Sequence, residues 1–439
     1  MMREPGHARV NYVGARVVDV VRSTVLEDAV LVTEGTRVSG FGRRADYPRE
    51  LPGQVVDCTG ATIVPGLFNC HVHLALDGDA TPYPIKLPYL RSLAEPDLFA
   101  IYAEQARRNL LAGVTTVRDT HPGPGGQTTT YLVLQEALRR GLLVGSRVYL
   151  SLRPLVVPGG HGTHWLSRAV SGADETVRAV RENVAEGANL IKLMTAFAWG
   201  PLPGKPESWS RYFAPAELRA AVDTAHGHGL PVAAHAHGTK AILDCVAAGV
   251  DSIEHGTGLT PELVELMAQR GTFLVPTLAS YHNFHRAGPG HGETDARVGD
   301  SDYVRRRQRE GLELAIRAGV RIAAGTDSGF VYLPHGDVIV DELELYVECG
   351  MSPMGALRSA TRTAAQLVGV VDELGSLEPG MVADLLVVDG APDKEITALR
   401  AIRRVVKEGR AIEPDAGSPL NAEPLSRNVV RTEMQNTRP

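Results

Sequence analysis

The chain has 439 residues, of which 44% are hydrophobic, and its formal net charge is -6 at pH 7. This length and composition exclude a disordered or fibrous protein and favour one large domain with a smaller one attached. The charge gives no electrostatic surface for nucleic acid, and no stretch offers the roughly 18 uncharged apolar residues that a membrane span needs. The N-terminus lacks the apolar segment of a secretory signal, so we expect a cytoplasmic protein.

Residues 9–64 alternate short β-branched runs with turns, which is typical of a small antiparallel sheet. The same pattern returns in residues 375–390 and 402–410. We therefore predict that residues 1–64 and 366–412 combine into one β-sandwich domain built from both termini. Residues 413–439 are polar and rich in turn-forming residues, which predicts a flexible C-terminal tail.

Residues 65–365 alternate short apolar runs with amphipathic helical stretches, several of which end at glycine. Eight strands that alternate with helices predict an α/β fold of the (β/α)8 TIM barrel type. The eight runs are IVPGLFNCHVH (63–73), VTTVRD (114–119), RVYLSL (147–152), ANLIKLM (188–194), LPVAAHAH (230–237), DSIEHG (251–256), TFLVPT (272–277) and RIAAGTD (321–327).

Polar side chains stand at the ends of these apolar runs. In a TIM barrel the catalytic residues lie at the C-terminal ends of the strands, so the pattern predicts a site at that rim. The residues that close the runs are His71, His73, Asp119, Lys192, His235, His255 and Asp327.

The pair His71 and His73 is the first candidate for metal binding. Because side chains alternate along a strand, both imidazoles lie on one side, which in a barrel is the interior. Cys70 then faces the helix layer, and we interpret it as a packing residue. The four cysteines lie far apart without CxxC spacing, which is typical of free thiols in a reducing compartment.

His235, His255 and Asp327 bring further ligand types to the same rim. Neutral imidazole with carboxylate oxygen is the ligand set that zinc and its first-row neighbours accept. Each residue alone could equally be a hydrogen-bonded buried polar group. Their joint occurrence at strand ends favours a metal centre.

Lys192 lies within an apolar strand, where an ammonium group is costly to bury unless it is paired or neutralised. A lysine in its neutral form can react with carbon dioxide, and the resulting carbamate has two oxygens that can bridge two cations. The alternative is a lysine that forms a salt bridge with an acid of the barrel.

The order of these motifs resembles the amidohydrolase superfamily: His-x-His after PGLFN, then GANLIKLM, VAAHAHG, DSIEHG and AGTDSG. More narrowly, it is similar to the branch that contains imidazolonepropionase-like proteins, Xaa-Pro dipeptidases and related N-acyl amino acid hydrolases. The similarity covers nearly the whole chain. It implies six metal ligands, which are His71, His73 and Asp327 for one divalent ion, His235 and His255 for the second, and carboxylated Lys192 as the bridge.

The resemblance implies two divalent ions, zinc or alternatively manganese, iron or cobalt. A water that bridges two such ions becomes hydroxide near neutral pH, and one ion polarises the substrate carbonyl. Asp327 can then take the proton and deliver it to the departing amine. We therefore expect an amidohydrolase that cleaves a C–N amide bond in an N-acyl amino acid, a dipeptide such as Xaa-Pro, or a related secondary metabolite. The expected partner is a small molecule, and the oligomeric state is left open.

Three residues are candidates for substrate binding. His161 matches a histidine that contacts the substrate's carboxylate or carbonyl in the resembled peptidase-like group, although a capping or surface histidine fits equally well. His237 follows His235 by two positions and faces the same interior, where several relatives carry tyrosine. Tyr212 belongs to the aromatic residues of the long loops that we expect to form a partly apolar pocket wall. These loops are 152–172, 199–212 and 278–302.

Two other functions compete with this interpretation. The first is mononuclear chemistry on a cyclic amide or imidazolone, or a deamination. Deaminases of the superfamily usually place a glutamate three positions after the histidine of strand five, where this chain has Gly238. The second is a scaffold that has lost catalysis, but such proteins lose metal ligands that this chain keeps.

Overall fold

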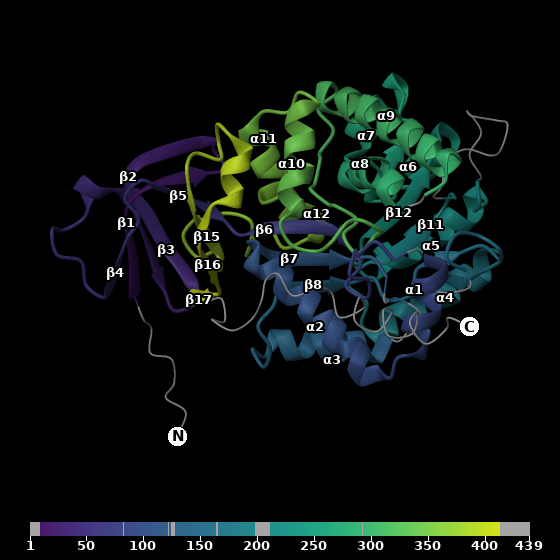
Figure 1. The fold of residues 1–439 in the computed structure, drawn as a ribbon, viewed down its shortest axis with the longest axis horizontal. Coiled ribbons are helices and arrows are strands. Elements are labelled where there is room, and N and C mark those ends of the chain that lie inside the picture. The colour runs from purple at the N-terminus through teal and green to yellow at the C-terminus, as the bar shows by residue number, and fades with distance from the viewer. Residues whose placement is uncertain are drawn as a thin grey trace.

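The structure is a computed structural model, and it describes residues 9–412 except 82, 122, 124–127, 164–165, 198–210 and 292. The tail predicted from residue 413 onward, and Trp199 and Trp209 of the predicted pocket wall, lie outside the described residues. Figure 1 shows a lobe made mostly of strands at one side and a larger body of strands and helices beside it.

The lobe is built from strands of both ends of the chain, which hydrogen bonds join in one eight-stranded sheet. Its order is β17-β16-β15-β5-β1-β2-β3, and β4 pairs with β1. Its buried side chains, Tyr12, Leu31, Ile63 and Leu385 among them, form a hydrophobic cluster of their own. The strands are β1 (Arg9–Asp19), β2 (Thr24–Glu34), β3 (Arg37–Arg43), β4 (Gln54–Asp57), β5 (Ala61–Pro65), β15 (Leu385–Asp389), β16 (Ile402–Lys407) and β17 (Arg410–Ile412).

This sheet differs from the expected antiparallel sandwich in two respects. It is mixed, because β1 runs parallel to both β4 and β5. These two strands follow one another along β1, and residues 58–60 between them do not reverse the direction of the chain. The strands are also hydrogen-bonded in one continuous sheet. The register of β1 against β2 shifts between Val13 and Val17, where β1 exchanges β4 for β5 as its other neighbour.

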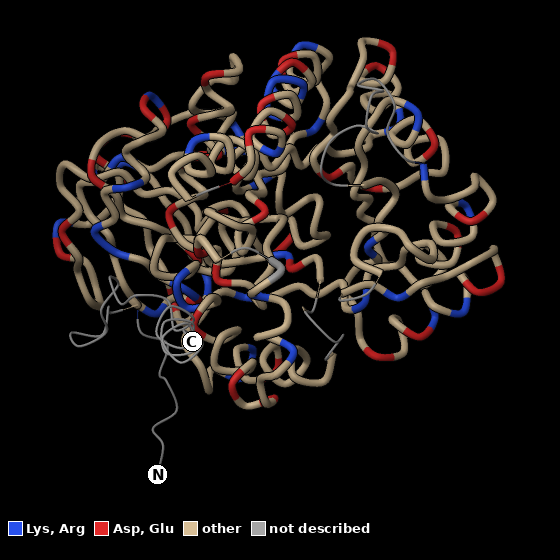
Figure 2. The backbone as a smooth tube through the Cα atoms, turned by 45° about the vertical axis from the view of Figure 1, so that its right-hand side comes forward, with Lys and Arg blue, Asp and Glu red and all other residues tan. Residues whose placement is uncertain are grey.

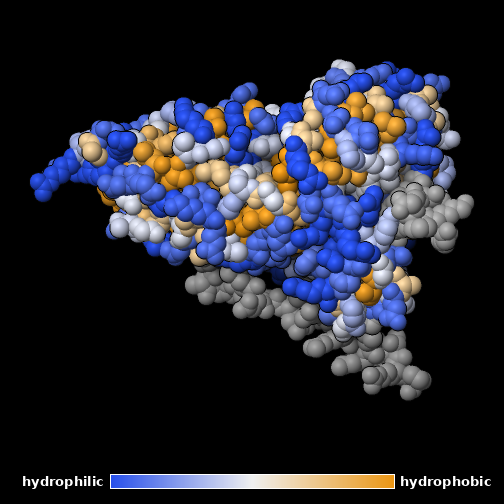
Figure 3. Space-filling view, turned by 90° about the horizontal axis from the view of Figure 1, so that it is seen from above, coloured by the Kyte–Doolittle hydropathy of each residue, from blue (hydrophilic) through white to orange (hydrophobic). Residues whose placement is uncertain are grey.

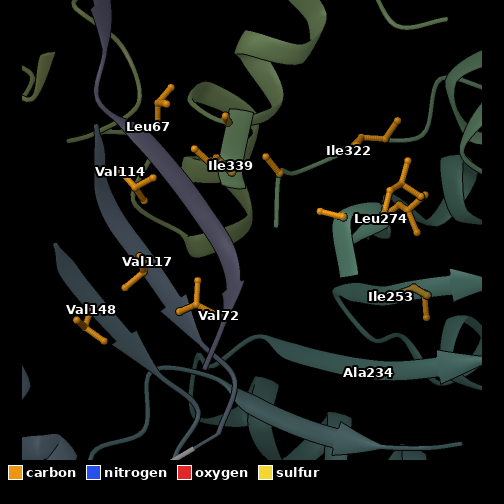
Figure 4. Packing of buried hydrophobic residues seen from close by; sticks show 14 of the residues in the cluster. Leu67, Val72, Val114, Val117, Val148, Ala234, Ile253, Leu274, Ile322 and Ile339 are labelled. Atoms are coloured by element: carbon orange, nitrogen blue, oxygen red, sulfur yellow. The ribbon is translucent and has the colours of Figure 1, made fainter. Parts of the chain in front are cut away.

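The larger body contains parallel strands in two sheets, β6-β7-β8 and β10-β9-β11-β12-β13-β14. The strands β6, β7, β11, β12, β13 and β14 are buried along their whole length, as expected for parallel strands covered on both faces. Figure 4 shows Leu67, Val114, Val148, Ile253 and Leu274 in this core. The strands are β6 (Leu67–Val72), β7 (Val114–Asp119), β8 (Arg147–Leu150), β9 (Leu155–Val156), β10 (Arg168–Ala169), β11 (Ile191–Met194), β12 (Val232–His237), β13 (Ser252–Thr257) and β14 (Phe273–Val275).

The eighth predicted strand, residues 321–327, is not a regular strand. Ile322 forms an isolated parallel bridge with Leu274 of β14, and Ser328, directly after the segment, forms one with Val72 of β6. The segment therefore lies between the last strand of one parallel sheet and the first strand of the other.

A side-chain hydrogen bond explains why the backbone hydrogen bonds between strands are interrupted in this segment. The backbone N–H of Thr326 donates to the side-chain oxygen of Asn69 rather than to a strand carbonyl. The N–H of Asp327 nevertheless donates to the carbonyl of His71 at 2.8 Å. Asp327 and His71 are thus fixed side by side at the rim of the strands.

Helices connect and cover the parallel strands (Figure 1). Glycines in the left-handed conformation end α4, α6 and α7, as the sequence predicts. The helices are α1 (Tyr83–Ser92), α2 (Glu95–Leu111), α3 (Thr128–Arg139), α4 (Ala173–Glu186), α5 (Pro215–Gly227), α6 (Thr239–Ala248), α7 (Pro261–Arg270), α8 (Leu278–Ala287), α9 (Asp295–Arg317), α10 (Val338–Glu348), α11 (Pro353–Ser359) and α12 (Arg362–Val368), with short 3-10 turns η1 (Arg44–Asp46), η2 (Gly288–His291) and η3 (Ile396–Arg400).

The prediction of a loop over residues 278–302 was wrong, because this segment forms α8, η2 and the first turns of α9. Two backbone N–H groups at the start of α8, those of Leu278 and Ala279, donate to the buried carboxylate of Glu342 in α10. This interaction caps the helix from a distant part of the chain, which the local sequence does not reveal.

Acidic and basic residues are interspersed along the backbone in Figure 2. Hydrophilic and hydrophobic residues are likewise mixed on the face in Figure 3. No helix of the described residues combines the length and apolar character that a membrane crossing requires. All four cysteines are buried and free, and Cys70 packs in a hydrophobic cluster with residues of α12.

Candidate active site

A cavity of ≈ 360 Å³ opens at the C-terminal ends of the parallel strands. The six predicted metal ligands all line it, although they come from strands distributed over most of the chain. They are His71, His73, Lys192, His235, His255 and Asp327.

The first group of possible ligands comprises His71, His73 and Asp327, whose ligand atoms lie within 4.8 Å of one another. The Oδ1 atom of Asp327 lies 2.7 Å from Nε2 of His73 and 3.5 Å from Nε2 of His71. All three residues are at least 92% buried, with exposures of 1%, 8% and 7% in chain order. Two imidazoles and one carboxylate in this arrangement suit a first-row divalent ion.

The second group comprises His235, His237 and His255, with ligand atoms again within 4.8 Å. The Nε2 atom of His235 is buried and has no hydrogen-bond partner among the described residues. A buried nitrogen in this state is costly unless it binds something else, so this atom fits a metal ligand. The rings of His71 and His255 lie 5.0 Å apart, which places the two groups next to each other.

Hydrogen bonds outside the groups orient their imidazoles. Nδ1 of His71 lies 2.7 Å from the carboxylate of Glu254, and therefore carries the proton that it donates. Nδ1 of His255 lies 2.7 Å from the hydroxyl of Thr277, which itself donates to the carbonyl of Pro276 and so accepts from the ring. In both histidines the lone pair is left on Nε2, which is the tautomer that a metal ligand needs.

Glu254 is a functional residue that sequence reasoning missed. It is fully buried, and both of its carboxylate oxygens lie 2.8 Å from the guanidinium of Arg118. The pair lies directly behind His71 and fixes its ring. A signal was present in the sequence, because Glu254 and Arg118 are charged residues inside apolar runs and each precedes a polar residue at a strand end.

Burial shifts the pKa values of Lys192 and Asp327 toward their neutral forms. It lowers the pKa of Lys192 to about 8, against the nearby charge of Glu254. It also raises the pKa of Asp327 to about 7. A neutral amine is the form of lysine that reacts with carbon dioxide, and a carboxyl group that titrates near neutral pH suits proton transfer.

Two of the candidate ligands have unusual backbone conformations. His255 has φ 69° and Asp327 has φ 66°, both in the left-handed region that non-glycine residues rarely adopt. Such strain persists only where the surrounding structure enforces it, and it is concentrated at functional sites.

The three predicted substrate-binding residues have different positions. His161 lines the cavity, and its ring stacks on His235 at a centroid distance of 5.3 Å. His237 is fully buried and does not line the cavity, although it belongs with His235 and His255 to the second group of possible ligands. Tyr212 lies one layer farther out, where its ring is beside the backbone of Gly160, which does line the cavity.

His121 lines the cavity and was missed in the sequence. Its ring stacks on His73 at 3.8 Å, and its Nδ1 accepts the N–H of Gly123. The signal that could have found it is its position two residues beyond Asp119, the last residue of β7.

Comparisons with known proteins agree with this geometry. The profile of the Amidohydrolase family matches residues 62–412. Ochratoxinase of Aspergillus niger is 28% identical over 417 residues, which cover 88% of this chain and 83% of that protein. Imidazolonepropionase of Sphingopyxis alaskensis is 24% identical over 88% of this chain and 93% of its own length. The crystal structure of a Xaa-Pro dipeptidase with bound methionine in the active site superposes with a TM-score of 0.81, at 27% identity, and covers 93% of this chain and all of that chain.

Proposed function

Because the chain belongs to the amidohydrolase family, and is therefore a hydrolase of carbon–nitrogen bonds, we propose that it cleaves the amide bond of a small N-acyl compound with two divalent metal ions. The family resemblance inferred from the sequence motifs is confirmed by these comparisons. The substrate class comprises N-acyl amino acids, dipeptides of the Xaa-Pro type and related secondary metabolites. The similarity to an ochratoxinase and to a Xaa-Pro dipeptidase supports this choice.

The observation that carries the proposal is the pair of adjacent, buried groups of possible ligands. In this proposal His71, His73 and Asp327 would hold one ion, and His235 and His255 would hold the second. Lys192, as a carbamate, would be a ligand of both. The second group also contains His237, which becomes a further candidate ligand. Zinc suits the imidazole and carboxylate donors, with manganese, iron and cobalt as alternatives.

When bound, the ions supply Lewis acidity for the substrate carbonyl and lower the pKa of a water molecule. Asp327 accepts the proton of the attacking water, because its carboxylate lies at the cavity wall. It then delivers this proton to the amine nitrogen as the C–N bond breaks. His161 and His121 line the same cavity and can donate hydrogen bonds that orient the acyl group.

We also propose that the two parallel sheets are parts of one (β/α)8 barrel, which residues 321–328 close. The bridges from this segment to Leu274 and Val72 support the closure. Residues 65–365 would form the barrel domain, and residues 1–64 with 366–412 the smaller one. The sheet that joins strands from both ends of the chain supports this division.

Metal content tests the proposal first. Protein purified without chelator in bicarbonate buffer is expected to contain about two equivalents of divalent metal per chain, measured by elemental mass spectrometry. One equivalent would instead support mononuclear chemistry on an imidazolone or another cyclic amide. No metal after attempted reconstitution would indicate a scaffold and contradict the proposal.

Substitution of the carboxylate behind His71 should weaken metal binding. Glu254→Gln is expected to lower the affinity for metal by about 10- to 100-fold, because His71 loses its charged hydrogen-bond acceptor. The affinity is measured by competition with a chromophoric chelator.

Glu342→Gln is the matched control for this variant. Glu342 is also fully buried, but its carboxylate caps α8 instead of contacting a candidate ligand. Its substitution should lower the melting temperature while metal affinity stays within about twofold of the wild type. Equal loss of metal affinity in both variants would show that Glu254 acts only through stability.

A further inference from the structure

Besides the candidate ligands, the cavity has an apolar wall. Six apolar or aromatic side chains form it, and they come from α1, the loop around Leu166, β11 and its following loop, α8 and the turn after Asp327. Met194 and Tyr281 are buried, whereas Phe197 is 44% exposed. The six are Leu87, Leu166, Met194, Phe197, Tyr281 and Phe330.

The aromatic side of this wall is supported from behind. Phe330 lies 6.3 Å from Tyr281 and 6.4 Å from the fully buried Phe284, between ring centroids. Phe284 in turn contacts Tyr332 at 5.6 Å. Because Glu342 also fixes the first turn of α8, which carries Tyr281, the wall is preformed for an apolar group.

Charge distinguishes this wall further. Of the described residues that line the cavity, Lys192 is the only lysine or arginine, and it lies among the candidate ligands. The guanidinium of Arg118 lies behind the base, where both oxygens of Glu254 already bind it. A substrate carboxylate beside these apolar side chains would lose water without gaining a cationic partner among the described residues, which is unfavourable.

We infer that the preferred substrate carries an uncharged aromatic or branched aliphatic group beside the scissile amide and gains nothing from a free carboxylate. This inference rests on the proposed amide hydrolysis and narrows its substrate class. Among the small N-acyl compounds of that proposal, it favours neutral amides and disfavours the free N-acyl amino acids and dipeptides. The cavity volume of ≈ 360 Å³ suits a small molecule with one ring-sized substituent.

Matched compounds test the inference. N-acetyl-L-phenylalanine and N-phenylacetyl-L-alanine are each compared with their own N-methylamides, and release of the acyl group is measured with the metal-loaded protein. We expect kcat/KM at least about tenfold higher for each neutral compound, because no charge is desolvated at the wall. A ratio near one, or a preference for the acids, would overturn the inference.

The same compounds separate this inference from the proposed hydrolysis. If no compound is cleaved, the proposed function fails for them, and calorimetric binding of the uncleaved compounds still decides the inference. Tighter binding of the methylamides supports it. Equal or tighter binding of the acids contradicts it.

A substitution that adds charge provides a second test. Phe197→Arg is expected to shift the ratio of acid to methylamide kcat/KM by about fivefold toward the acids, since it places a partly exposed cation at the wall. Leu243→Arg is the matched control, because Leu243 is 45% exposed and does not line the cavity. An unchanged ratio in Phe197→Arg, or an equal shift in both variants, would contradict the role of the wall.

Discussion

Lys192→Ala is expected to reduce kcat by at least about 10³-fold while the protein remains folded, because it removes the one lysine among the described residues that line the cavity, and with it the proposed bridging carbamate. The lysine is 2% exposed and lies in β11. Turnover of N-acyl compounds and metal content are measured on the same sample. We expect the metal content to fall below about one equivalent together with activity.

Chemical rescue distinguishes a carbamate from an ordinary buried lysine. A short carboxylic acid such as propionate fits the space left by Lys192→Ala and presents two oxygens, so we expect it to restore part of the turnover. Lys407→Ala serves as the control, because Lys407 lies in the terminal sheet and donates to the carbonyl of Gly145. A Lys192→Ala protein that turns over near the wild-type rate would refute the bridging role.

Asp327→Asn is expected to lower kcat by about 10²- to 10⁴-fold, the range for removal of a general acid–base group. Asparagine keeps the size of the side chain and one oxygen, so the fold and the left-handed backbone at this position should be retained. It cannot accept the proton of water or return it to the amine. The measurement is single-turnover acyl release, with metal content determined alongside.

Asp384→Asn is the matched control for this variant, since Asp384 is also buried, at 5% exposure against 7% for Asp327. Its carboxylate forms an ion pair with Arg147. Neither residue lines the cavity. We expect it to lose stability but keep turnover. Comparable losses of kcat in both variants would mean that Asp327 acts through the fold rather than in proton transfer.

Much of the candidate site could be predicted because its residues are tied to strand ends. The period of two along a strand places His71 and His73 on one side without any tertiary information. The same local logic marked Lys192 as a charge within an apolar run. Glu254 carries the same signal but was missed, and its role required the position of Arg118, which is 136 residues away in the chain.

The positions of His237 and Tyr212 could not be predicted in this way. His237 shares the face of His235, yet it lies against His255 and Thr257 of the neighbouring strand rather than at the cavity. Tyr212 follows a segment outside the described residues, and its ring is placed by tertiary packing, beside Gly160 and against the main hydrophobic core. Spacing fixes the direction of a side chain, but not which neighbour occupies the space in front of it.

The sequence by itself determined the family, the alternation of strands and helices, and the six residues that line the base of the cavity. These depend on local periodicity and on residue types, which are written in short stretches of chain. Three features became visible only in the tertiary structure. They are the irregular segment at 321–327, the buried Arg118–Glu254 pair behind His71 and the apolar wall of the cavity. Each of these arises where side chains from distant segments satisfy one another's hydrogen bonds or exclude water together, and no single stretch of sequence contains both partners.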